Sequence, residues 1–118
     1  MRRKLLLVCC ALLGAAFVPG VHASGGKGSY ELPWRTRGEV LEYRSCGCAD
    51  SCWVAEVRDT RTKALRGRLR CDCERLFYMP GPHGPERVQA QSCEIVEGAA
   101  DKSQAIGHAL ERLLLRAR

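Results

Sequence analysis

Six cysteines in the middle and C-terminal part of this chain limit its fold more than any other feature. They form two close groups and one isolated residue: Cys46, Cys48 and Cys52, then Cys71 and Cys73, then Cys93. An even number of cysteines in a short exported chain is typical of a disulfide framework. Whether these residues are disulfides, a metal site or a redox centre therefore depends first on the compartment.

The N-terminal segment predicts export. Arg2, Arg3 and Lys4 precede an uncharged apolar run from Leu5 to Val18, and small residues end at Ala23. This layout is that of a secretory signal peptide, so we expect residues 1–23 to be removed. The apolar run is shorter than the roughly 20 residues that span a bilayer, and no stable membrane span is expected after cleavage. The predicted location is the periplasm or the extracellular space.

Removal of the signal changes the charge and the length of the chain. It takes three of the 19 basic residues and none of the 13 acidic ones, so the formal net charge falls from +6 to +3. Nucleic acid is therefore not an expected partner. Residues 24–29 form a Gly/Ser tether that we expect to be flexible. Residues 30–118 are enough for a single small disulfide-rich domain.

Four stretches have the period of two that marks a strand with one buried face. They are residues 39–46, 53–58, 64–79 and 87–96. In the third, Leu65, Gly67, Leu69, Cys71 and Cys73 would share one face. Residues 80–86 contain three prolines and two glycines and are predicted to be a loop.

After Gly98 the period becomes helical. One side of the predicted helix carries Ile106, Ala109, Leu110, Leu113, Leu114 and Ala117. Asp101 or Ser103 can cap its start. The predicted fold is therefore α+β: a small antiparallel sheet of about four strands with one C-terminal amphipathic helix, held by disulfides.

The predicted pairing of the cysteines follows from strand geometry. Residues i and i+2 of a strand lie about 6.6 to 6.8 Å apart on one face, at the limit of a disulfide. Cys71 and Cys73 are therefore expected to bond to Cys46 and Cys48, in either order. That leaves Cys52 to pair with Cys93.

Two other interpretations use the same sulfur atoms. Cys46 and Cys48 could bridge each other around Gly47 and act in thiol exchange. Alternatively, Cys46, Cys48, Cys71 and Cys73 could bind a thiophilic metal. The sequence has neither a Cys-x-x-Cys motif nor the usual zinc-finger spacing, so no cofactor is expected.

We find no sequence motif for an enzyme, and predict a small exported binding protein of the inhibitor or immunity type, with another protein as partner. Its strongest binding signal is a basic row on one face of the third predicted strand. A proline-rich loop preceded by aromatic residues is a second contact candidate. The predicted partner-binding residues are Arg66, Arg68, Arg70, Tyr78 and His83.

Overall fold

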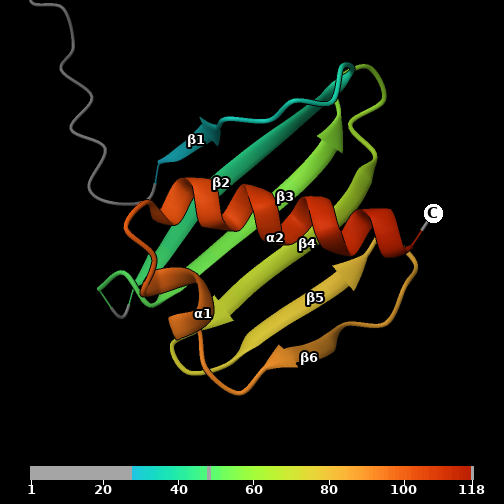
Figure 1. The fold of residues 1–118 in the computed structure, drawn as a ribbon. Helices are drawn as coiled ribbons and strands as arrows, with labels where there is room; N and C mark the ends of the chain where they lie inside the picture. Colours follow the sequence, from blue (N-terminus) through green and yellow to red (C-terminus); the bar gives the residue numbers. More distant parts are fainter. Residues whose placement is uncertain (1–27, 48, 118) are drawn as a thin grey trace, which may run out of the picture.

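The computed structural model describes residues 28–47 and 49–117, which form an α+β fold (Figure 1). Its elements are β1 (Ser29–Leu32), β2 (Glu39–Gly47), β3 (Cys52–Asp59), β4 (Leu65–Asp72), β5 (Leu76–Pro80), β6 (Arg87–Ala90), α1 (Glu94–Glu97) and α2 (Lys102–Arg116). The described strands make one sheet in the order β1-β2-β3-β4-β5-β6, and each pairs antiparallel with the next. The α+β class is thus confirmed, but with six strands where about four were predicted.

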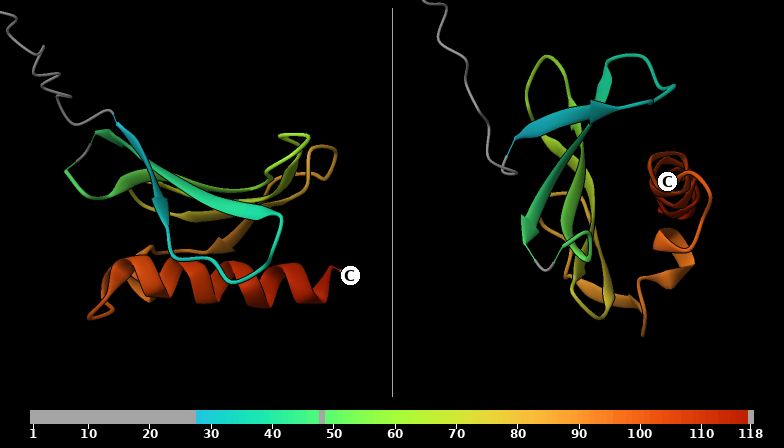
Figure 2. Two further views of the ribbon diagram at one scale, coloured as in Figure 1. Left: turned by 90° about the horizontal axis from the view of Figure 1, so that it is seen from above. Right: turned by 90° about the vertical axis from the view of Figure 1, so that its left-hand side faces the viewer.

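The molecule has two layers, a sheet and the helices that cover one of its faces (Figure 2). Alternate residues of β4 are buried, which is the pattern of a strand with one covered face, and β3 follows the same pattern except that Glu56 is buried as well. The core between the layers contains Leu32, Leu41, Tyr43, Trp53, Ala55, Val57, Leu69, Cys71, Leu76, Cys93, Val96, Ile106, Leu110 and Leu114. The predicted inward face of the third strand is therefore confirmed as far as Cys71.

The predicted strand over residues 64–79 is wrong, because the chain turns back at Cys73. Cys73 has a φ of 82°, and the Asp72 carboxylate accepts hydrogen bonds from the backbone N–H groups of Glu74 (3.1 Å) and Arg75 (2.7 Å). An aspartate that bonds the backbone two and three residues later forms a tight turn. Two strands, β4 and β5, result, and Cys73 does not continue the face of Cys71.

The predicted strand over residues 87–96 is also too long. Its first four residues form β6, at the edge of the sheet, and the chain then enters α1. At the other edge Ser29 belongs to β1, although the sequence predicted it as part of the tether. The predicted signal at 1–23 and residues 24–27 of the tether lie outside the described residues.

Helix α2 carries the predicted apolar stripe. Ile106, Leu110 and Leu114 are buried against the sheet, whereas Ala117 lies beyond the end of the helix. Asp101, rather than Ser103, is the cap, because its side chain accepts a 3.0 Å hydrogen bond from the Gln104 backbone N–H. No helix among residues 28–47 and 49–117 is long and apolar enough to cross a membrane.

The helix packs closely because β4 presents a glycine to it. A Cβ atom at Gly67 would lie 2.9 Å from Cδ2 of Leu114. The absence of a side chain at this inward position lets α2 approach the centre of the sheet. The opposite face of the sheet is left uncovered by either helix (Figure 2).

Candidate functional site

Two disulfides are described, and neither matches the predicted pairing. Cys46 bonds to Cys52 with a Cα–Cα distance of 5.0 Å, and Cys71 bonds to Cys93 with a distance of 6.0 Å. Cys73 is also disulfide-bonded, and Cys48 lies outside the described residues. Disulfides persist in oxidising surroundings, so the protein belongs to a compartment other than the reducing cytosol.

The register of the strands explains why Cys52 does not bond to Cys93. Trp53 pairs with Cys71 on the helix-covered face, so their neighbours Cys52 and Asp72 point to the other face. Cys93 precedes α1 on the covered side and therefore meets Cys71. A bulge after Ser45, at the end of β2, places Cys46 beside Cys52.

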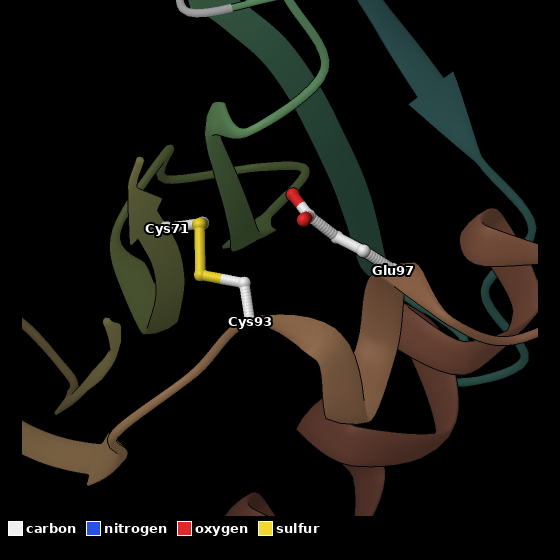
Figure 3. A group of neighbouring side chains, drawn as sticks. All are labelled: Cys71, Cys93 and Glu97. Atoms are coloured by element: carbon white, nitrogen blue, oxygen red, sulfur yellow. A yellow bond between two sulfur atoms is a disulfide. The ribbon is translucent and has the colours of Figure 1, made fainter. Parts of the chain in front are cut away.

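A carboxylate lies next to the buried disulfide. The Sγ atoms of Cys71 and Cys93 and a carboxylate oxygen of Glu97 all lie within 4.8 Å of one another (Figure 3). Trp53 Nε1 donates a 3.0 Å hydrogen bond to Glu97, and both cysteines are almost fully buried. Two sulfurs that bond to each other offer no thiolate to a metal, so this group joins α1 to the sheet.

The other predicted metal ligands do not form a cluster of free thiols either. Cys46 and Cys71 lie in separate disulfides, and Cys73 is also oxidised. The alternative interpretation, a bridge between Cys46 and Cys48, does not fit this structure because Cys46 bonds to Cys52. In this oxidised form the described cysteines act as covalent links.

The uncovered face of the sheet carries the predicted basic row. We define the exposed sheet face as the side chains of Arg44, Val54, Glu56, Arg58, Arg66, Arg68, Arg70 and Phe77. Arg66, Arg68 and Arg70 alternate with buried residues along β4, so they point away from α2 as predicted. The strands curve away from α2 at their ends, which makes this face concave (Figure 2, left).

At its centre lies Glu56, a carboxylate held by three arginines. Its oxygens contact Arg44 (2.7 Å), Arg58 (2.8 Å) and Arg68 (2.9 Å). Only 3% of the Glu56 side chain is exposed, against 49%, 30% and 29% for the three arginines. Burial alone would raise the pKa of Glu56, but hydrogen bonds from Arg68 and Arg44 and the arginine charges lower it below its ordinary value.

The two outer arginines of the row are also paired. Arg70 Nε lies 2.9 Å from both carboxylate oxygens of Glu86, and its guanidinium stacks 4.2 Å above the centre of the Phe77 ring. The hydrogen bond from Arg70 lowers the pKa of Glu86. Arg66 contacts Asp59 at 3.2 Å. The row is therefore ordered and only modestly positive, since most of its charges have partners.

The structure separates the remaining predicted contact residues from this row. Tyr78 belongs to β5 but packs against the core on the covered side, and burial raises the pKa of its hydroxyl group. That buried hydroxyl has no hydrogen-bond partner among the described residues. His83 is exposed in the loop after β5. The prediction did not include Arg44 and Glu56, although the alternation of their strands placed both on this face.

Comparisons with protein-family models, with curated protein sequences and with solved structures found no match for this chain.

Proposed function

We propose that this chain is a small exported binding protein that recognises another protein through the exposed sheet face. It would act as a periplasmic inhibitor or immunity protein does, by occupying a surface of its partner. The observation that carries the proposal is the Glu56 cluster, in which one buried carboxylate holds three partly exposed arginines. Export to an oxidising compartment agrees with the disulfides.

Arginine side chains that are already held in place in the free protein favour binding. A long side chain that becomes fixed on association loses conformational entropy, and an arginine already held by an ion pair loses less. Each guanidinium has five N–H donors, so an arginine bonded to Glu56 keeps donors for a partner. Arg44, with 49% of its side chain exposed, has the most room to use them.

The composition of this face also suits a protein partner. The register places Arg44, Val54, Arg70 and Phe77 in one row across four strands, so arginine alternates with apolar groups. Arginine and aromatic residues are enriched in protein interfaces. A polyanion would gain less, because Glu56, Asp59 and Glu86 already neutralise much of the charge.

The size of the face is adequate. The six described strands contain 38 residues, and at about 3.3 Å per residue and 4.8 Å between strands they cover roughly 600 Å². One partner in a stable complex typically contributes about 800 Å². The uncovered face of the sheet can therefore supply most of one side of a standard interface.

Site-specific photocrosslinking tests this proposal. A photoreactive amino acid replaces Val54, which pairs with Arg44 on the exposed sheet face, and in a control it replaces Leu115, which is 68% exposed on α2. The protein is irradiated in the cells that make it, and adducts are identified by mass spectrometry. We expect one defined protein adduct from position 54. An adduct from position 115 alone would refute the proposed surface.

Affinity measurements with the purified partner complete the test. Arg66→Ala with Arg70→Ala should weaken the complex by at least about tenfold, since arginine is enriched among the few interface residues whose truncation costs most of the binding free energy. Arg37→Ala with Arg61→Ala is the control, because both residues are exposed and remain outside this face. Equal losses from the two double variants would contradict a specific role for the arginine row.

The alternative function, thiol-based metal binding or redox exchange, has its own test. It requires free thiols in the working protein, whereas a binding scaffold requires none. We expect the intact mass of the purified protein to stay unchanged after treatment with an alkylating reagent, and metal analysis to find no bound ion. Alkylation of native protein at Cys71 or Cys73 would favour the alternative.

A further inference from the structure

A second surface lies on the other side of the sheet, between α2 and the edge strand β6. It is a cleft of about 370 Å³, within the range of ligand sites. Its lining comes from both helices, β5 and β6: Leu76, Gln89, Ile95, Val96, Ala105, His108, Ala109, Arg112, Leu113 and Arg116. None of these residues belongs to the exposed sheet face, so this cleft is independent of the function proposed above.

The rim of the cleft is basic. His108, Arg112 and Arg116 are exposed and follow one another at intervals of four residues, so they form one stripe along α2. Arg112 and Arg116 make no ion pair with any residue of the described ranges. In this they differ from the arginines of β4, each of which has a carboxylate partner.

The floor of the cleft is apolar, and its opposite wall is an edge strand. Leu76 and Val96 are buried at the floor, and Ile95 is 68% exposed. The far wall is β6, the edge of the described sheet (Figure 1), where β5 occupies one side of the strand. An edge strand without a neighbour presents backbone N–H and C=O groups that can pair with an added strand.

We propose that this cleft binds an extended acidic peptide segment of a partner protein, which adds to β6 as a seventh strand. On an added strand, residues i and i+2 face α2 and lie about 6.6 Å apart. Arg112 and Arg116 are separated by about 6 Å along the helix axis. Two acidic side chains at i and i+2 therefore match the two arginines, and an apolar residue at the next inward position contacts Ile95.

Fluorescence anisotropy with two labelled pentapeptides tests the charge requirement. One has the order Glu-Thr-Glu-Thr-Val and the other the reverse order, because a strand can pair in either direction. We expect one of them to bind, and its lysine-for-glutamate analogue not to bind. Arg112→Glu with Arg116→Glu should weaken binding at least about tenfold, since two attractions become repulsions. Arg37→Glu with Arg61→Glu changes the net charge equally and should leave binding intact.

Two further measurements test the location and the strand pairing. Amide NMR shifts on peptide binding should concentrate in β6 and in the segment 108–116 of α2. Alternate amides of an added strand point toward β6. N-methylation of one alternate set of peptide amides should therefore abolish binding, and methylation of the other set should spare it.

Several results would overturn the proposal. The first is that neither peptide binds at about 1 mM, because a dissociation constant above this concentration is too weak for specific recognition. The second is that the lysine analogue binds equally well. The third is that the two methylation patterns have equal effects. Cleft shifts caused by laurate but not by the peptides would assign the site to an anionic amphiphile instead. None of these outcomes depends on the exposed sheet face, so the two proposals fail separately.

Discussion

Replacement of Glu56 by glutamine is the sharpest test of the Glu56 cluster. The change keeps the shape of the side chain but removes its charge, so Arg44, Arg58 and Arg68 lose their common counter-ion. The new amide group also brings two N–H donors to a place surrounded by guanidinium donors. The three arginines then repel one another without compensation, and we expect the folded state to lose stability.

The magnitude follows from the exposure of the four side chains. An exposed ion pair contributes about 0.2 to 1 kcal/mol, and removal of one partner of a fully buried pair costs about 3 to 5 kcal/mol. Glu56 is 3% exposed but its partners are 29–49% exposed, so the cluster lies between these limits. We expect Glu56→Gln to lower the free energy of unfolding by about 2 to 3 kcal/mol.

Urea unfolding followed by circular dichroism measures this loss. With a slope of about 1 kcal/mol per M, the midpoint should fall by about 2 M or more. Glu42→Gln is the matched control, because Glu42 faces Glu56 across β2 and β3 but forms no ion pair with a described residue. Its midpoint should move by less than about 0.5 M. Equal shifts for the two variants would refute the reasoning.

The same variant predicts a pH dependence. The folded-state pKa of Glu56 is lowered, so its contribution to stability is complete above the unfolded value and is lost as pH falls through the folded value. Glutamine does not titrate. The stability difference between the wild type and Glu56→Gln should therefore be constant near neutral pH and should shrink below about pH 4. A difference that grows on acidification would contradict the assigned sign.

Three further predictions concern local features. Asp101→Ala should cost about 1 kcal/mol in urea unfolding through loss of the helix cap, whereas Ser103→Ala should cost much less. The Asp59 carboxyl should titrate with a pKa of about 2 in carbon-detected NMR, mainly because the Thr62 backbone N–H binds it; a value near 3.8 would contradict this geometry. Replacement of both Cys71 and Cys93 by serine should lower the free energy of unfolding by about 3 kcal/mol, since their bridge closes a loop of 22 residues. Unchanged stability would show that this bridge is dispensable.

The sequence predicted those parts of the fold that depend on local alternation. A period of two in hydrophobicity indicates which side of a strand meets the core. The residues that it placed on the inner side of β2 and β3 are buried: Leu41, Tyr43, Ala55 and Val57. The same reasoning placed Arg66, Arg68 and Arg70 on the opposite face. The helical period likewise left Leu115 out of the apolar stripe of α2, and it is 68% exposed.

Alternation failed where a turn interrupted a continuous pattern. Residues 64–79 keep their period through Cys73, so the hairpin between β4 and β5 left no break in hydrophobicity. The signal was the side chain of Asp72, which can bond the backbone N–H groups that follow it. Without that turn, β5 could not pair with β4, and the sheet would lack the edge that lines the cleft.

The wrong disulfide pairing has a related cause. It assumed that cysteines two residues apart act together, but a disulfide depends on which face each residue occupies after bulges and turns. The bulge after Ser45 shifts the register of β2 at Cys46, and Cys73, with its positive φ, lies beyond the end of β4. Cys71 lies on the covered face of β4, where it bonds to Cys93 and fixes the start of α1 beneath the sheet. Because α1 contributes Ile95 and Val96 to the cleft, this bridge holds one wall of the proposed peptide site in place.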